Sequence, residues 1–471
     1  MIKIRASNVP NSDLPMYELF KTQTAERILL HEYEIELLEF LLKFNPIRSV
    51  EFVDLATFLR SKAGLNGKQP RLNTSQRLLR LKQANLIKSV NATELNGYKL
   101  LYKNYFYTIT PRALDVLVEL NRIDYTTYKK HKSYLRKRSA TFQAPSLHSI
   151  AVSKVAVDSY IQLSAMYKRE QFEISKGSSN ALFVQNKVSK DNLIPDLVIS
   201  LPSNRLLCIE VDGGKQSKDV IVDKYLRYKS LAETKLNTYI LQLIFASIDD
   251  DMLDGEGMGN KVTRSKRLKE FIPLFTKWPD NLNVFVFRYS GMPTYFSKVE
   301  KEIELPFSSV IDNLLQMWLF KFKIVLSDYS VNIYKESDLL PSSVHNEFSP
   351  NLVLGIKRQD KRERYYFVYY VQGGYVKSAQ LLREVSEKAV AINNSDTNRL
   401  EIRVLLVYQT KKERESDVLE MYAHADDVLV LATSIEEWDE INVNNQNIAY
   451  PFYTQHYRLF NFNIRKEDLR L

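Results

Sequence analysis

The sequence predicts a multidomain α/β protein that opens with a basic, mainly helical domain. Three observations support this fold class. Residues 1–150 contain 24 Lys and Arg against 13 Asp and Glu, whereas the rest of the chain contains 42 against 43. From residue 145 the pattern changes to alternating helices and strands. Residues 306–471 then repeat the order of elements that begins at residue 145.

Composition bounds the class of protein. The chain has 471 residues, of which 45% are hydrophobic and 26% charged, as in soluble globular proteins of about three domains. The single cysteine, Cys208, excludes an intrachain disulfide and a cysteine-ligated zinc or iron–sulfur site. No apolar run reaches the roughly 18 residues of a membrane span, and no signal segment is evident. We therefore expect a cytoplasmic protein.

Hydrophobic periodicity predicts three helices in the N-terminal region, over residues 24–44, 50–61 and 73–84. A hairpin follows around Asn96-Gly97, because both residues tolerate positive φ. Thr110 suits the N-cap and Pro111 the first position of a closing helix. This order of elements resembles a winged helix-turn-helix domain. The alternative is a small helical domain with a solvated polar face.

The resemblance implies that the third helix enters the major groove of duplex DNA. The expected base-contacting and backbone-contacting residues are Arg71, Asn73, Gln76, Arg77 and Arg80. A basic run is expected to contact phosphates from a linker; its residues are Lys129, Lys130, Lys132, Arg136, Lys137 and Arg138. A membrane surface is a weaker partner, because the basic region is not one amphipathic helix.

The middle region carries three acids near the ends of predicted strands. A helix over 145–167 precedes strands at 197–201 and 206–212, and a helix over 218–234 follows. Glu210 and Asp212 face the same side of their strand, and Asp196 can reach them from the adjoining strand. Carboxylates in an apolar strand need a partner or a cation. Hard oxygen ligands of this kind suit Mg²⁺ or Mn²⁺.

Pro195-Asp196, followed after a gap by Glu210-Val211-Asp212, resembles the PD-(D/E)XK nuclease superfamily, and the segment with Gly213-Gly214 resembles its very-short-patch-repair branch. The resemblance implies that Asp196 and Glu210 bridge a metal and that Asp212 binds the metal or orients water. Asp212 occupies the position of the superfamily lysine. Lys215, Lys218 or Lys224 would have to replace it, and Lys215 and Lys218 are the expected choices.

A wider resemblance spans residues 20–240. A winged helix, a helix opening with His148, the two acidic strands and a basic helix containing Tyr225 and Tyr228 are similar to the replication-relaxation family. The resemblance implies a role in plasmids or other mobile elements, in replication or DNA relaxation. We interpret the two tyrosines as packing residues and His148 as a structural or phosphate-facing residue.

The C-terminal region lines up with the middle region at a constant offset of 160, which pairs Gly373-Gly374 with Gly213-Gly214. Asn351, Tyr370 and Gln372 then stand where Asp196, Glu210 and Asp212 stand. We expect a degenerate nuclease-like domain without a cation site, which is also the candidate surface for a homodimer. The alternative is an unrelated α/β domain.

The expected organisation is a tail over 1–22, a winged helix over 23–125, a basic linker over 126–144, a nuclease-like domain over 145–300 and its degenerate copy over 301–471. The expected function is that of a protein of a plasmid or mobile element that binds double-stranded DNA and nicks or cuts it nearby. Other proteins of the same element are candidate partners. The rival is a non-enzymatic replication initiator or transcriptional regulator that uses the same domains as a scaffold.

Overall fold

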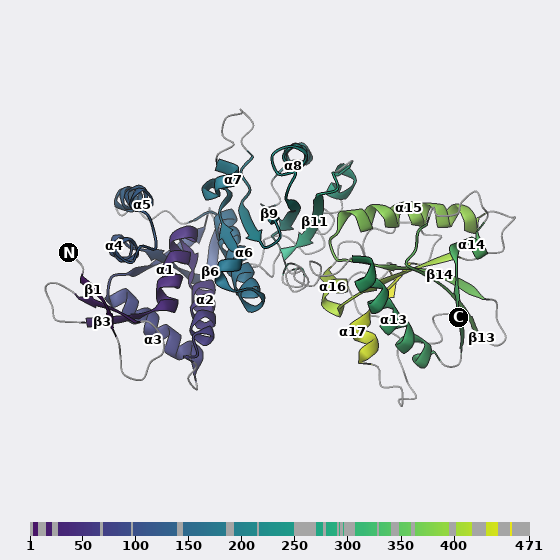
Figure 1. The fold of residues 1–471 in the computed structure, drawn as a ribbon, viewed down its shortest axis with the longest axis horizontal. Helices are drawn as coiled ribbons and strands as arrows, with labels where there is room; N and C mark the ends of the chain where they lie inside the picture. Colours follow the sequence, from purple (N-terminus) through teal and green to yellow (C-terminus); the bar gives the residue numbers. More distant parts are fainter. Residues whose placement is uncertain are drawn as a thin grey trace. The chain divides into compact units, whose positions relative to one another are not determined.

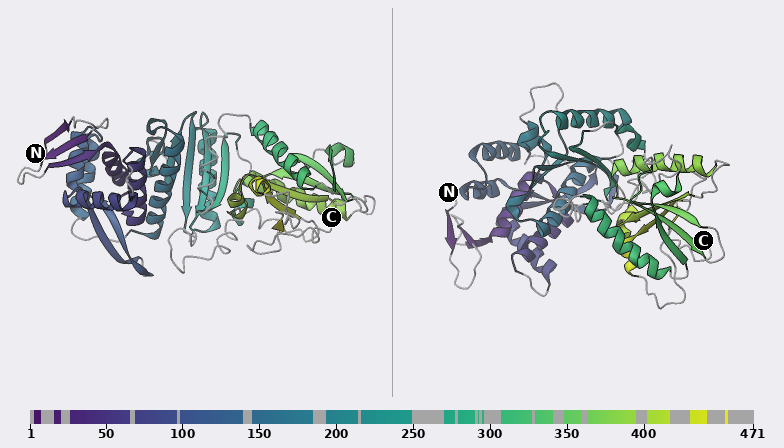
Figure 2. Two further views of the ribbon diagram at one scale, coloured as in Figure 1. Left: turned by 90° about the horizontal axis from the view of Figure 1, so that it is seen from below. Right: turned by 45° about the vertical axis from the view of Figure 1, so that its right-hand side comes forward.

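The computed structural model forms two compact units, Met1–Pro202 and Ser203–Leu471, which are described separately (Figures 1 and 2). The residues that it describes are 3–7, 16–20, 27–65, 69–95, 98–138, 145–184, 193–213, 216–248, 270–276, 279–289, 292, 295, 307–326, 329–340, 348–358, 363–394, 402–416, 430–440 and 453–454. None of the helices in these ranges is long and apolar enough to cross a membrane.

The first unit begins with three antiparallel strands, β1 (Lys3–Ser7), β2 (Met16–Phe20) and β3 (Arg27–His31). Helix α1 (Glu32–Phe44) follows. The prediction of a helix from residue 24 is therefore wrong at its start. The Glu34 carboxylate accepts a hydrogen bond from the backbone N–H of His31 at 2.8 Å, which fixes the first turn at Glu32.

Helices α2 (Ser49–Lys62) and α3 (Pro70–Gln83) confirm the second and third predicted helices. Helix α3 starts earlier than predicted because Pro70 occupies its first turn. Strands β4 (Ile47–Arg48), β5 (Ile87–Leu95) and β6 (Tyr98–Ile109) form a sheet in the order β4-β6-β5.

The β5–β6 hairpin extends away from the helices (Figure 2). Leu95 pairs with Tyr98. The residues between them, Asn96-Gly97, lie outside the described residues. The side chain of Thr110 accepts a hydrogen bond from Ala113 N and caps α4 (Pro111–Glu119), as predicted.

Residues expected to form a basic linker form helix α5 (Tyr125–Arg138) instead. It packs on α4 through one carboxylate, because Tyr128 Oη and Lys132 Nζ both donate to Asp115 Oδ1, at 2.6 and 2.8 Å. The long side chains of Tyr128 and Lys132 reach α4, while other charged side chains of α5 stay in water.

Helix α6 (Leu147–Met166) packs against α2 and β4 within the first unit. Ser153 Oγ donates to the carbonyl of Phe44 at 3.2 Å, and Tyr160 Oη donates to Glu36. Strands β7 (Glu173–Ser175) and β8 (Leu197–Leu201) pair antiparallel beyond it. The helix predicted to open the middle region is therefore held by the N-terminal helices.

The second unit begins with β9 (Arg205–Asp212), α8 (Lys218–Glu233), β10 (Ile240–Ser247) and β11 (Leu282–Arg288). Strands β9, β10 and β11 are parallel, with β10 in the middle. Every residue of β9 is buried, as expected for a parallel strand that is covered on both faces. The predicted strand over 206–212 and helix over 218–234 are confirmed.

The C-terminal sheet has the order β12-β13-β14-β15-β16-β17. Its strands are β12 (Tyr329–Tyr334), β13 (Leu352–Arg358), β14 (Arg364–Tyr370), β15 (Ile402–Tyr408), β16 (Val430–Ser434) and β17 (Tyr453–Thr454). Helices α13 (Phe307–Val325) and α17 (Ile435–Asp439) cover one face, and α15 (Val376–Asn393) covers the other (Figures 1 and 2).

The order β14–α15–β15, with parallel strands, repeats the order β9–α8–β10. The predicted residue correspondence is nevertheless wrong. Glu210 points toward the crossover helix α8, whose Lys224 and Tyr228 it contacts. Tyr370 instead packs with the cluster around α13, on the face opposite α15. Side chains alternate between the two faces of a strand, so residues on opposite faces are not equivalent. The constant offset of 160 therefore does not pair equivalent residues of the two sheets.

The two remaining members of the predicted correspondence have structural roles. Asn351 directly precedes β13, and its Oδ1 accepts a hydrogen bond from Tyr370 N at 2.8 Å. Gln372 lies beyond the end of β14 and is buried. Gly373 N–H donates to Glu413 Oε1 at 2.8 Å. Gly373 therefore belongs to the packing of its own strand ends.

Gly374 sits where the C-terminal sheet meets β11. Its φ is +74°, and its carbonyl accepts a hydrogen bond from Val286 N at 2.8 Å. A Cβ here would lie 2.6 Å from Phe287 Cε1 and 2.7 Å from the Val286 carbonyl oxygen. The close approach therefore requires glycine.

We expect Gly374→Ala to lower stability by about 2–4 kcal/mol, because it combines an unfavourable φ with a steric clash. Gly64→Ala is the matched control: φ there is +72°, but nothing lies within 4 Å of its Cβ. That change should cost about 1 kcal/mol. Thermal unfolding of the full chain measures both, and equal losses would show that the approach to β11 is not what demands glycine.

Candidate functional site

The outer side of α3 is polar and basic. Thr74, Leu78 and Leu81 are buried and pack the helix against the rest of the first unit. Of the residues predicted to contact DNA, Arg71, Gln76 and Arg80 are exposed and Asn73 is half-buried. Arg71 also forms an ion pair with Asp54 at the surface. The exposed side thus offers guanidinium and amide groups, the donors that bind phosphates and base edges.

Arg77 does not belong to this exposed side, and the prediction that it does is wrong. Its side chain is 17% exposed, and its Nε donates to Glu34 Oε1 at 2.5 Å. A second nitrogen donates to the carbonyl of Leu29. Burial alone would lower the pKa of Arg77, but its hydrogen bonds and charge interaction with Glu34 outweigh that effect and raise it. Arg77 is a buried anchor between α3, α1 and β3.

The predicted phosphate-contacting run divides into three groups. Lys129 and Lys130 are exposed on α5, and Lys129 Nζ lies 4.6 Å from the centre of the Tyr125 ring. Lys132 is engaged with Asp115 and Tyr128. The side chains of the remaining three lie outside the described part; they are Arg136, Lys137 and Arg138.

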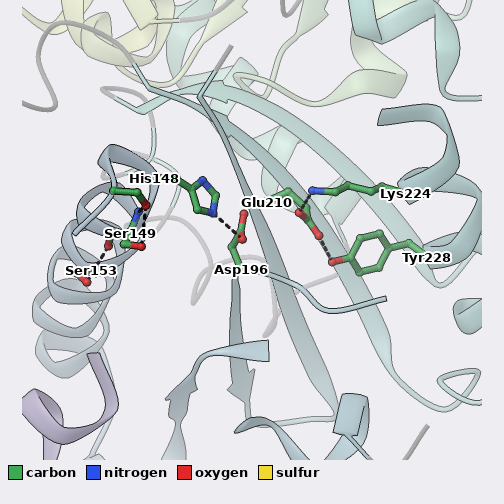
Figure 3. Close-up of polar contacts among 8 residues, drawn as sticks. His148, Ser149, Ser153, Asp196, Glu210, Lys224 and Tyr228 are labelled. Carbon is green, nitrogen blue, oxygen red and sulfur yellow. Dashed lines mark hydrogen bonds and ion pairs between the residues drawn. The ribbon is translucent and has the colours of Figure 1, made fainter. Parts of the chain in front are cut away.

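A buried carboxylate on β9 is held by two side chains of α8 (Figure 3). Lys224 Nζ lies 2.6 Å from Glu210 Oε2, and Tyr228 Oη lies 2.6 Å from Glu210 Oε1. Lys224 and Tyr228 are four residues apart, so both point to the same side of the helix. Ile221 and Tyr225, which are buried, place this side against the sheet. The result is a charged pair inside the second unit.

The other predicted residues of this site have different positions. Asp212 ends β9, is buried and lies on the same side of the strand as Glu210. Lys218 forms an ion pair with Glu270 at 3.1 Å, and its catalytic role stays a prediction. Lys215 lies outside the described residues. The lysine beside Glu210 is thus Lys224.

Sequence reasoning named Lys224 only as a third candidate lysine and interpreted Tyr228 as a packing residue, so it did not predict their contacts with Glu210. A carboxylate in an apolar strand needs a partner, and the following helix is the nearest source of one. Lys224 shares the helix side that carries Ile221, Tyr225 and Tyr228. Lys218, three residues before Ile221, lies near this side too, so only the contact with Glu210 in the structure distinguishes Lys224.

A second polar pair lies in the first unit. His148 Nε2 is 2.9 Å from Asp196 Oδ1, and Figure 3 shows the two side chains pointing toward each other. His148 stands in the first turn of α6, whose N-cap Ser146 accepts a hydrogen bond from Ser149 N. Asp196 directly precedes β8. The pair therefore joins a helix start to a strand start.

The acids were expected to hold Mg²⁺ or Mn²⁺. Both oxygens of Glu210 accept hydrogen bonds, and Asp196 faces His148. Within the ranges that the structure describes, no three His, Cys, Asp or Glu side chains gather in a way that could hold a metal ion. The side chains as arranged do not form the expected three-carboxylate site, and binding of either ion stays a prediction.

No curated protein and no solved structure matches the chain. Residues 56–240 match the family model described as replication-relaxation. The match runs from within α2 to the first residue of β10 and includes α3, the His148–Asp196 pair and the Glu210–Lys224 pair. Over residues 56–240, the chain is therefore similar to the replication-relaxation family.

Proposed function

We propose that this chain binds duplex DNA through a winged helix, within the role in replication or relaxation of a plasmid or other mobile element that the matched family supports. The proposed domain comprises α1, α2, α3, the β4-β6-β5 sheet and α4. Helix α3 would enter the major groove, and the β5–β6 hairpin would contact the backbone.

The observation that carries this proposal is the exposed side of α3. Gln76 and Arg80 are four residues apart and exposed on the helix surface, while Leu78 and Leu81 are buried beneath it. Ser75 is exposed beside them, and small polar side chains let a helix approach base edges. The excess positive charge of residues 1–150 would add an attraction for phosphates that weakens with salt.

We expect Arg80→Ala to weaken binding of the full chain to a mixed-sequence duplex about tenfold, and to lower the salt-dependence slope by about 0.9. Arg383→Ala is the matched control: it also removes one exposed guanidinium, but from α15. Fluorescence anisotropy across a range of salt concentrations measures both. The proposal fails if the parent protein does not bind, or if the two variants bind alike.

A second candidate function is hydrolysis of a DNA phosphodiester at Glu210. It is favoured by the contact between Lys224 and the buried Glu210 carboxylate. A lysine ammonium next to a carboxylate can stabilise the negative charge that develops on a phosphate under attack, while the carboxylate orients the attacking water. Tyr228 would keep Glu210 in place.

Participation of Asp196 in the same reaction remains part of the proposal. Conversion of supercoiled plasmid to nicked or linear forms, with Mg²⁺, Mn²⁺ or a chelator, tests the activity. If the protein binds DNA but does not cut it under any of these conditions, the non-enzymatic replication initiator or transcriptional regulator is the better explanation.

A further inference from the structure

Helix α13 is apolar on two opposite sides. Its inner side belongs to the C-terminal core, where Trp318 and Phe322 are fully buried. Its outer side exposes Met317, Phe320 and Ile324, at 61%, 67% and 41%. A helix side that carries several large apolar residues is normally covered. Large apolar side chains exposed together mark an interaction surface.

The three exposed side chains form one stripe. They are three and four residues apart, the spacing that places residues on one side of a helix. Asn313 is exposed one turn before Met317 and extends the stripe toward the N-terminus of the helix. Apolar residues with this alternating spacing of three and four are typical of a helix that packs against a second helix.

The charged residues beside the stripe indicate that the second helix is α13 of another copy of the chain. Asp312 and Lys323 are both exposed, and helical geometry places them on the same flank of the stripe. An antiparallel pair of α13 helices, related by a two-fold axis near residue 318, brings Asp312 of each copy toward Lys323 of the other. A parallel two-fold pair would instead place the Asp312 and Lys323 side chains of the two copies on opposite sides of the interface, so these pairs could not form. On the opposite flank, Lys321 pairs within the chain, with Asp439 at 3.2 Å.

We propose that two copies of this chain associate through α13, antiparallel, with Met317, Phe320 and Ile324 at the centre and two Asp312–Lys323 pairs at the rim. The interface uses the same surface on both copies, so it closes as a dimer. A single pair of short helices buries less than a standard interface, which predicts association at micromolar concentration. This inference is independent of DNA binding and of strand hydrolysis.

Phe320→Glu should weaken dimerisation of the full chain by more than about tenfold, because it puts a charge at the centre of the apolar seam. The matched control is Leu381→Glu, which introduces the same charge at another exposed apolar residue, on α15. Sedimentation velocity over a concentration series measures the dimer fraction. A parent protein that is monomeric throughout, or two variants that associate alike, would overturn the proposal.

The charge pairs test the orientation. Asp312→Lys and Lys323→Asp should each weaken the dimer about tenfold, because each replaces two attractions by two repulsions. The double variant should regain the dimer, since it restores both pairs with their signs exchanged. Mixing the two single variants should give a heterodimer. A dimer that forms in the parent but is not regained in the double variant would overturn antiparallel self-pairing.

Discussion

We expect the replacement of Lys224 by Met to lower the stability of the second unit by about 3 kcal/mol, because it leaves the Glu210 carboxylate charged in a buried place with one hydrogen-bond donor fewer. The Glu210 side chain is only 3% exposed, and Lys224 Nζ lies 2.6 Å from it. Denaturant unfolding of the full chain measures the loss. Converting Glu210 to Gln in the same variant should recover part of it, since the unpaired charge is then removed.

The control is Lys229, five residues further along the same helix. Lys229 is about as exposed as Lys224, at 24% against 22%, but its partner Glu233 is at the surface and 4.0 Å away. Lys229→Met should therefore cost less than about 1 kcal/mol. Comparable losses in the two lysine variants would mean that the Glu210 pair contributes no more than a surface pair.

The Lys224→Met variant also tests whether Lys224 takes part in DNA hydrolysis. If the protein hydrolyses DNA, Lys224→Met should abolish conversion of supercoiled plasmid at temperatures where it remains folded, and Lys218→Met should not. Lys218 pairs with Glu270 in the structure and does not contact Glu210. Loss of activity in the Lys218 variant alone would move the catalytic role back to the lysine that the sequence favoured.

Arg77→Ala is expected to unfold the first unit at markedly lower temperature, with a loss of about 3–5 kcal/mol. The change leaves Glu34, whose side chain is 1% exposed, without its guanidinium partner. Arg80→Ala, three residues away on the exposed side, should change stability by less than about 0.5 kcal/mol. Thermal unfolding of both variants provides the comparison.

This pair of variants separates structure from recognition. Arg77→Ala should weaken DNA binding only in proportion to the unfolded fraction, whereas Arg80→Ala should weaken it with the fold intact. An Arg77→Ala protein that melts like the parent yet has lost its DNA site would return Arg77 to the recognition surface. Removing an arginine is the same chemical change in both, so burial alone distinguishes the expected results.

Local signals in the sequence predicted several elements well. Thr110-Pro111 predicted the start of α4, because capping depends on neighbouring residues and not on the rest of the fold. The start of α1 was missed because Ile28, Leu29 and Leu30 suit a strand as well as a helix. A short apolar run carries no period long enough to choose between them.

The candidate sites were harder to predict, for a different reason. Arg77 and Arg80 look alike in sequence, and only the packing of α3 on α1 shows that one is buried against Glu34. Glu210 could be predicted to need a partner, but long lysine side chains let several positions of α8 qualify. The choice depends on tertiary contacts that propensity and spacing do not encode.

The contact at Gly374 has a consequence for the solubility of the chain. Strand β11 ends its sheet, and its sequence Leu-Asn-Val-Phe-Val-Phe-Arg is strongly β-forming, so its open side could recruit strands from other molecules. The Val286 N–H that points outward is taken by the Gly374 carbonyl, and Phe285 forms an antiparallel bridge with Tyr375. Gly374 and Tyr375, which follow β14, thus cover this edge, and we expect a chain shortened before them to aggregate more readily.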